Sequence, residues 1–195
     1  MNIVVLAGGL STERDVSLNT GTMVSKALRS KGHNVIMLDV FMGYHEEEED
    51  ITDIFNHTEE ASADVAQIPG EAPDIAQVKA MRKDQSACFF GPNVIKICQA
   101  ADIVFMALHG ENGENGKIQA AFDLFGIQYT GSRYLGSALA MDKGISKKMF
   151  EAAGIPTPHG IAMSKTQRHT PFSETGLTLP CVVKPCCGGS SIGVT

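Results

Sequence analysis

Hydrophobic residues near the N-terminus follow first a strand pattern and then a helical one. Ile3–Ala7 is a short apolar run rich in β-branched residues, which predicts a buried strand. The pair Gly8-Gly9 follows as a turn whose backbone can approach a ligand closely. Beyond Asp15, apolar positions recur at spacings of three and four, which predicts a helix that ends near Gly32. The residues with this spacing are Val16, Thr20, Met23, Val24, Ala27 and Leu28.

The same succession of strand, glycine turn and helix returns in the middle of the chain. Asn34–Val40 predicts a second strand, and Asp102–Leu108 is the clearest strand of all. The latter runs directly into the glycine-rich turn His109–Lys117, and a helix follows. Strands joined through helices form parallel pairs, so we expect an open, mostly parallel α/β sheet. Its ligand crevice should lie beyond the carboxyl ends of the strands, where both glycine turns meet.

The rest of the chain divides less clearly. Gly43–Ser86 carries an acidic run and scattered prolines, and we expect a solvated, partly helical excursion there. Gly131 begins a new unit, so the predicted domains are 1–131 and 132–195. In the second unit Asp142 can cap a helix that continues to Ala153. The predicted strands that remain are Ile127–Thr130, Gly160–Met163 and Cys181–Pro185.

Composition restricts the class of protein. The 195 residues are 43% apolar and 19% charged, as in an ordinary globular protein. A net charge of -6 disfavours nucleic acid and anionic membranes as partners. Neither a signal peptide nor a long apolar run is present, so we expect a cytoplasmic protein. The five cysteines then remain thiols, and their spacing does not suit zinc.

Four charged or titratable side chains are candidates for chemistry. Glu13 lies at a helix start, where the macrodipole favours a carboxylate, although a solvated surface residue is the alternative. His109 ends a strand among glycines and acids; it is either a site residue or a hydrogen-bonded packing residue. Lys143 opposes the dipole of its helix, which a phosphate would explain. Lys184 ends an apolar strand, where we expect a buried ammonium that needs an anion. The loop Gly188–Gly193 follows it, and its amides and hydroxyls could fold over polyphosphate.

Several motifs, in the same order, resemble those of the D-alanine:D-alanine ligases, a family of ATP-grasp enzymes. The family's opening, G-G-x-S-x-E-R-x-V-S-L, is similar to the residues around Glu13, and its H-G-x-x-G-E-D-G motif is similar to the turn at His109. The resembling segments are Ala7–Leu18, Leu108–Gly116, Tyr129–Ser132, Ser137–Lys143 and Val183–Gly193.

This resemblance implies a fold and a reaction. The fold would be an N-terminal α/β domain of the pre-ATP-grasp type, followed by an incomplete α+β ATP-grasp central domain. In the reaction, ATP phosphorylates the carboxylate of one D-alanine, and the amine of a second attacks the acyl phosphate. The dipeptide enters peptidoglycan and so serves cell-wall biogenesis and cell shape. The resemblance also implies a homodimer.

The resemblance further implies residue roles. Glu13 would hold the ammonium of the first D-alanine, Val16 would pack beside it, and His109 would lie by its carboxylate. Lys143 and Lys184 would contact the ATP phosphates. The closing loop would bind nucleotide through Gly189, Ser190 and Ser191, with Ser190 also linking Glu13 to that loop as a catalytic residue.

Departures from the family pattern limit these implications. Asn115 replaces a usual aspartate, and Cys186 and Cys187 occupy loop positions normally held by other residues. The carboxylates for Mg²⁺ are expected beyond Thr195, so we expect a fragment without a metal site and without activity alone. D-Alanine:D-serine ligase, D-alanine:D-lactate ligase and another ATP-grasp carboxylate–amine ligase remain open, as does a stand-alone binding module.

Overall fold

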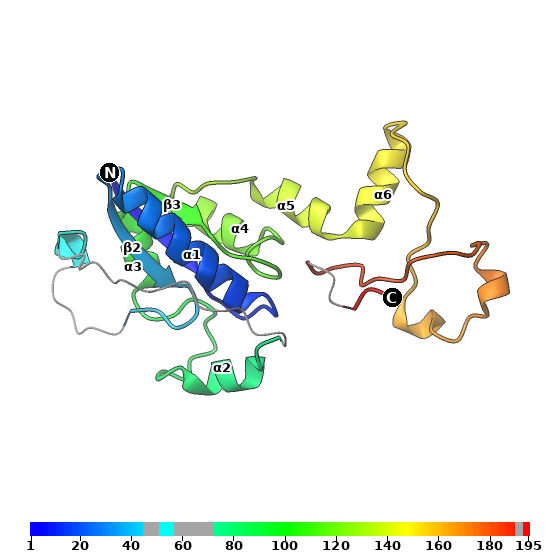
Figure 1. Ribbon diagram of the computed structural model, residues 1–195, viewed down its shortest axis with the longest axis horizontal. Coiled ribbons are helices and arrows are strands. Elements are labelled where there is room, and N and C mark those ends of the chain that lie inside the picture. The colour runs from blue at the N-terminus through cyan, green and yellow to red at the C-terminus, as the bar shows by residue number, and fades with distance from the viewer. Residues whose placement is uncertain (45–50, 57–71, 190–192) are drawn as a thin grey trace.

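The computed structural model describes residues 1–44, 51–56, 72–189 and 193–195, and its centre is a parallel sheet (Figure 1). Strands β1 (Asn2–Ala7), β2 (Asn34–Asp39) and β3 (Ile103–Met106) lie in the order β2-β1-β3. Ile3 is opposite Val35 on one side and Ile103 on the other. The predicted strand pattern is therefore confirmed for all three, because each run is apolar on both faces, as a covered parallel sheet requires.

Helices cover both faces of this sheet. Successive side chains of β1 point alternately to the two sides of the sheet and enter a separate hydrophobic core on each side. Val4 and Leu6 pack toward α3 and α4, whereas Ile3, Val5 and Ala7 pack toward α1. The result is a three-layer α/β/α arrangement, with α1 crossing in front of the strands in the view of Figure 1. The helices are α1 (Arg14–Arg29), α2 (Ile75–Met81), α3 (Val94–Ala100), α4 (Lys117–Phe125), α5 (Tyr134–Met141) and α6 (Lys143–Ala152), and the short 3₁₀ turns are η1 (Ile51–Asp53), η2 (Lys165–Gln167) and η3 (Phe172–Glu174).

Helix α1 contacts the sheet through small side chains. Its buried positions include Ser17, Gly21 and Ser25. A Cβ placed on Gly21 would lie 2.8 Å from the Cβ of Ala7, so the helix backbone lies close against β1. Met23, which the helical spacing placed on the hydrophobic stripe, is 59% exposed. The spacing predicts the helix and part of its packing face correctly, because Val24 and Leu28 pack against the core on this side of the sheet. It misses the small residues Ser17, Gly21 and Ser25, which form the fully buried part of that face.

Three shorter predicted strands do not form as strands: two make only isolated backbone pairs, and one has no regular structure. Segment Ile127–Thr130 contributes one isolated parallel bridge, between Tyr129 and Val104. No strand forms in the described part of residues 132–195. There, residues 160–163 have no regular structure, and Val183 pairs through its backbone with Thr195 at 2.8 Å in both directions. Apolar residues stabilise a strand by being covered, and the side chains of Val182 and Val183 are 66% and 67% exposed.

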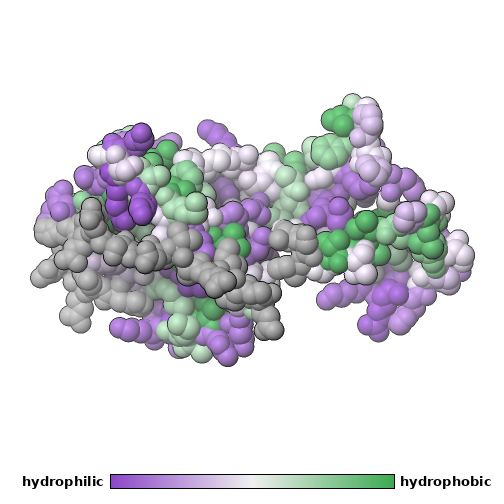
Figure 2. Space-filling view, viewed as in Figure 1, coloured by the Kyte–Doolittle hydropathy of each residue, from purple (hydrophilic) through white to green (hydrophobic). Residues whose placement is uncertain are grey.

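Residues 132–195 keep many apolar side chains at the surface. Figure 2 shows such side chains gathered on the side of the view that these residues occupy. Ile145 and Met149, expected to face inward from α6, are 42% and 48% exposed. The expected α+β organisation of this part stays a prediction.

Some predictions fall outside the described residues. The acidic run Glu46–Asp50 is among them, as are residues 45–50 and 57–71 of the predicted excursion Gly43–Ser86. The described part of this excursion contains η1 and α2. Among the residues that the structure describes, no helix combines the length and apolarity needed to cross a membrane.

Candidate functional site

The turns after β1 and β3 meet at the carboxyl edge of the sheet. The hydroxyl of Ser11 donates to the carbonyl oxygen of His109 at 2.7 Å and accepts the backbone N–H of Glu13 at 3.2 Å. Gly110 packs against the carboxylate of Glu13, because a Cβ on this glycine would lie 2.7 Å from Glu13 Oε2. Glu13 and His109, predicted separately from two strand ends, therefore border one region of the molecule.

A buried ion pair supports the first glycine turn. Arg14 pairs with Asp39 at the end of β2 and donates to the carbonyl oxygen of Gly9 at 2.8 Å. The same aspartate accepts the backbone N–H groups of Phe41 and Met42 at 2.9 and 3.0 Å. Both charges are thus satisfied, as burial demands. The sequence analysis did not select either residue, although Arg14 stands beside Glu13 in the first motif.

Ser17 joins the ends of two strands. Its hydroxyl accepts the N–H of Gly8 at 2.9 Å and donates to the carbonyl oxygen of Ala107 at 2.8 Å. The first turn of α1 is therefore fixed to both β1 and β3. Since Glu13 is the N-cap of that helix, its backbone position follows from these bonds.

His109 is held from two directions. Its Nε2 lies 3.0 Å from Oγ1 of Thr20 on α1, and its Nδ1 lies 3.9 Å from a carboxylate oxygen of Glu114. The side chain keeps 34% of its surface exposed, which leaves one edge of the ring accessible. Val16, one turn before Thr20, is half-buried on the same helix. Sequence reasoning missed Thr20 as a site residue, because its spacing suggested only a place on the helix stripe.

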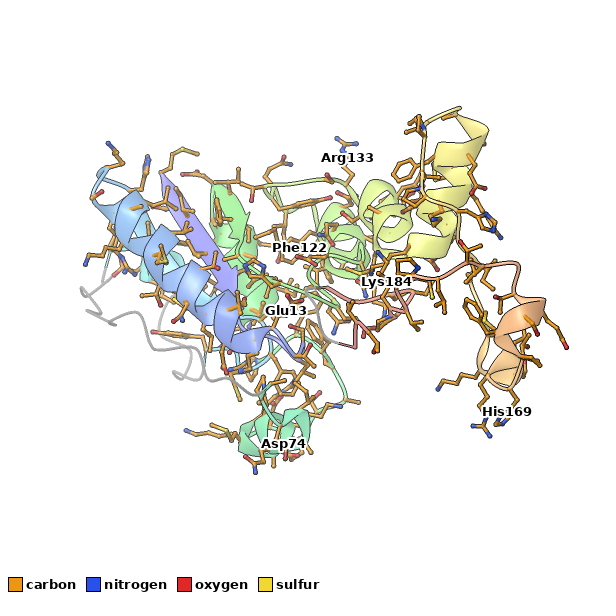
Figure 3. All side chains as sticks on the ribbon, turned by 45° about the vertical axis from the view of Figure 1, so that its right-hand side comes forward. Glu13, Asp74, Phe122, Arg133, His169 and Lys184 are labelled. Carbon is orange, nitrogen blue, oxygen red and sulfur yellow. The ribbon has the colours of Figure 1, made fainter. Side chains whose placement is uncertain are left out.

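A second group of residues surrounds a small pocket beside this region. The pocket has a volume of about 190 Å³ and is lined by Lys143, Val182, Lys184, Pro185, Gly188, Gly189 and Val194. A Cβ on Gly189 would overlap Glu13 Oε2, so the loop that carries this glycine reaches the tip of α1. Figure 3 shows Glu13 at the end of α1 and Lys184 on the chain segment facing it. Ser190 and Ser191 lie outside the described residues.

The two lysines differ in their surroundings. Lys143 is half-buried, and its ammonium donates to the carbonyl oxygen of Gly188 at 2.8 Å. Lys184 is exposed, so the expectation that it is a buried ammonium is wrong. Its apolar neighbours Val182 and Val183 are themselves exposed and do not desolvate it. Both lysines are candidates for binding an anion because they line the same pocket.

The N-terminus of α6 is capped as predicted. Asp142 accepts the N–H of Ile145 at 3.0 Å and the thiol of Cys186 at 3.1 Å. The backbone bond from Ile145, followed by the thiol bond, lowers the pKa of Asp142 below its ordinary value. The bond to Asp142 in turn raises the pKa of Cys186. The cysteine pair therefore links the pocket loop to the start of the helix that bears Lys143.

Metal ligands are not gathered in the described part of the chain. Within those residues, no three histidine, cysteine, aspartate or glutamate side chains come together in a way that could hold an ion. The placement of Mg²⁺ ligands beyond Thr195 stays a prediction.

Comparison with known proteins relates this geometry to a family. Residues 2–132 match the family model described as the N-terminus of D-Ala D-Ala ligase. A D-alanine–D-alanine ligase of Lacticaseibacillus casei is 43% identical over 99% of this chain and 53% of its own length. The chain thus spans about half the length of the curated relatives that it matches.

Solved structures show the same relationship. The D-alanine–D-alanine ligase of Bacillus anthracis matches with a TM-score of 0.62 and 28% identity, over 100% of this chain and 48% of that one. Its complex with ATP matches with a TM-score of 0.56 and 26% identity, over 89% and 41%. The VanG D-Ala:D-Ser ligase of Enterococcus faecalis matches with a TM-score of 0.61 and 29% identity, over 100% and 54%. With its first two-thirds matched by the family model and its whole length by these relatives, the chain belongs to the D-alanine–D-alanine ligase family.

Proposed function

We propose that this chain supplies the first D-alanine site and part of the ATP site of a D-alanine–D-alanine ligase. The observation that carries the proposal is the position of the Glu13 carboxylate. It contacts Gly110 beside the imidazole of His109, and it also contacts Gly189 beside the lysine-lined pocket. The proposed amino-acid site thereby adjoins the proposed phosphate site.

The proposed reaction joins two amino acids at the expense of ATP. The carboxylate of the first D-alanine attacks the γ-phosphate, which gives an acyl phosphate and ADP. The amine of the second D-alanine then attacks the acyl carbon, and phosphate leaves with the bonding pair. Placing the reactants accounts for much of the rate in such reactions.

The roles of individual side chains follow from their charges. Glu13 neutralises the ammonium of the first D-alanine, with Val16 packed beside that substrate, and His109 lies by its carboxylate. Lys143 and Lys184, together with the backbone of Gly189, hold the phosphates of ATP. Ser190 and Ser191 belong to the same proposed loop. Mg²⁺ has no ligand set among the described residues, so no step is assigned to it.

The experiment that tests this proposal compares two glutamates in the protein containing the complete ligase. Glu13→Gln removes the charge at the site, whereas Glu111→Gln removes one from a side chain that is 69% exposed. We expect the KM for the first D-alanine to rise at least about tenfold in Glu13→Gln, with nucleotide binding retained. Glu111→Gln should match the wild type. Equal kinetics for all three proteins would contradict the role of Glu13.

The second substrate is proposed to be D-alanine. The proposal is supported by the relatives from Lacticaseibacillus casei and Pediococcus pentosaceus, which are 43% and 44% identical and are named D-alanine–D-alanine ligases. Among the solved structures the D-alanine–D-alanine ligase and the D-Ala:D-Ser ligase are 28% and 29% identical, which does not separate D-alanine from D-serine. Competition between D-alanine and D-serine as acceptors decides between them. Preferential formation of the mixed dipeptide would establish D-alanine:D-serine ligation instead.

The organisation of the protein is likewise a proposal. We assign residues 1–131 to the substrate-binding domain and residues 132–195 to the start of the ATP-grasp domain. The protein is proposed to act as a cytoplasmic homodimer. Its mass in solution, measured by light scattering, tests the dimer, and a monomeric mass would refute it.

A further inference from the structure

We propose that Thr20 is a positioning residue: its hydroxyl accepts a hydrogen from Nε2 of His109, which fixes the Nε2–H tautomer of the neutral ring and leaves Nδ1 as the ring nitrogen available to the first substrate. This inference rests on the proposed function for the identity of that substrate. The tautomer itself rests on hydrogen-bond geometry alone, and the two parts are tested separately below.

The hydroxyl of Thr20 has one proton, and the helix already uses it. Oγ1 donates to the carbonyl oxygen of Val16 at 2.9 Å, the usual back-bond of a helical threonine. With its proton directed to Val16, the same oxygen accepts from Nε2 of His109, 3.0 Å away. We therefore assign a hydrogen to Nε2 in the neutral ring as well as in the charged one.

Nδ1 is then the ring nitrogen that either carries or lacks a hydrogen. In the neutral ring it presents a lone pair, and in the charged ring it presents a second N–H. It faces Glu114, whose carboxylate oxygen is 3.9 Å away and whose side chain is 44% exposed. A substrate carboxylate beside His109 can be held at Nδ1 only by the N–H of the charged ring. Thr20 thus decides which edge of the imidazole meets the substrate.

The frame around Thr20 is rigid enough for this role. Ser17 fixes the preceding turn of α1 to the end of β3, which is the strand that leads into His109. Gly21, the next residue after Thr20, lies against β1 without a side chain between them. The distance between Thr20 and His109 is consequently set by the packing of the helix on the sheet.

The tautomer is tested by nitrogen NMR of protein labelled at histidine, at an alkaline pH where the rings are neutral. We expect the His109 signals, identified by their loss in His109→Gln, to show hydrogen on Nε2. Thr20→Val, which keeps the shape but removes the acceptor, should give a mixture of tautomers. Thr20→Ser should restore the wild-type pattern. The exposed His159 serves as the internal control. Hydrogen on Nδ1 in the wild type, or an unchanged ring in Thr20→Val, would overturn the assignment.

The positioning role is tested by kinetics in the protein containing the complete ligase. Thr20→Val should raise the KM for the first D-alanine about tenfold while the KM for ATP changes little. Thr20→Ser should recover most of the loss, which a purely structural defect would not allow. A changed tautomer with unchanged KM would refute the positioning role. Absence of any D-alanine-dependent phosphate release in the wild type would refute the proposed function and leave the NMR result standing by itself.

Discussion

The hydroxyl of Ser11 lies 2.7 Å from the carbonyl oxygen of His109 and ties the turn after β1 to the turn after β3. The two residues are 98 positions apart in the chain. Since Ser11 also receives the N–H of Glu13, one small side chain coordinates the backbones of both proposed substrate-binding residues. The relative position of the carboxylate and the imidazole therefore depends on a residue that need not touch the substrate.

Ser11→Ala should loosen this connection. Ser11 is 6% exposed, so the N–H of Glu13 and the carbonyl oxygen of His109 would lose a partner away from solvent. We expect a decrease of about 1–3 kcal/mol in the free energy of unfolding, measured with urea, together with a higher KM for D-alanine. Thr12→Ala, at an exposed neighbouring position, should change neither quantity. A Ser11→Ala protein as stable as the wild type would contradict this account.

Gly8→Ala should be strongly destabilising. Gly8 has φ +75, and a Cβ there would overlap the carboxylate of Asp39 that pairs with Arg14. Gly32→Ala is the matched control, because Gly32 has φ +81 but no atom within 4 Å of the added carbon. We expect the control to cost about 1 kcal/mol from backbone strain and Gly8→Ala to cost on the order of 3 kcal/mol or more. Equal costs in thermal unfolding would show that Asp39 can move away freely.

Gly21→Ala and Gly136→Ala should change stability in opposite directions. Both glycines lie in helices, where alanine is intrinsically better by about 1 kcal/mol. At Gly21 the new carbon would lie 2.8 Å from Ala7 Cβ and 3.0 Å from Met37 Cε, whereas at Gly136 it meets nothing within 4 Å. We expect a net loss of about 1 kcal/mol at Gly21 and a gain of about 0.5–1 kcal/mol at Gly136. Stabilisation at both positions, measured by urea unfolding, would indicate that α1 lies less tightly on the sheet.

Cys98 should resist alkylation in the folded protein. It is 1% exposed, and burial raises its pKa from 9.0 to about 12, so the reactive thiolate is scarce at neutral pH. Mass spectrometry after brief iodoacetamide treatment should find the exposed Cys88 and Cys187 modified before Cys98. Unfolding in urea before treatment should make Cys98 react as well. Early native labelling of Cys98 would show that α3 opens readily.

The same thiol predicts a pH dependence of stability. A pKa that is higher in the folded than in the unfolded protein stabilises fully below the unfolded value, and this contribution is lost as pH rises through the folded value. The window for Cys98 runs from about pH 9 to about pH 12. Urea titrations at pH 8 and about pH 10.5 should show a smaller loss of stability in Cys98→Ala than in the wild type. Equal losses of unfolding free energy in the two proteins would show that Cys98 does not contribute to the pH dependence of stability.

The sheet was predictable from the sequence because its strands are covered on both sides. Runs such as Ile3–Ala7 are apolar throughout because both of their faces are covered. The buried face of α1 was predictable from hydrophobicity only in part: Val24 and Leu28 pack on the core. The fully buried Ser17, Gly21 and Ser25 had no hydrophobic signal, because they pack there through their small size. The segment Ile127–Thr130 shows another limit. It has strand-like residues, but its pairing with β3 amounts to a single bridge.

Candidate site residues could be predicted from the sequence only where a local motif marks them. Glu13 follows a strand and two glycines, and His109 ends a strand before a glycine-rich turn, so their positions alone make them candidates. Arg14 and Asp39 are 25 residues apart, and Thr20 and His109 are 89 apart. Partnerships over such separations exist only after the sheet has brought strand ends together. The roles of Asp39 and Thr20 therefore had no local signal.

The close fit of α1 on β1 limits how this domain can be altered. Filling the seam of Ser17, Gly21 and Ser25 with larger apolar residues would resemble an ordinary core improvement. It would instead lift the helix and carry Thr20 away from the imidazole of His109 and Glu13 away from Gly110. Larger core residues along α1 would therefore disturb the proposed substrate-binding residues. Substitutions meant to raise thermal stability should be made at exposed positions such as Gly136 instead.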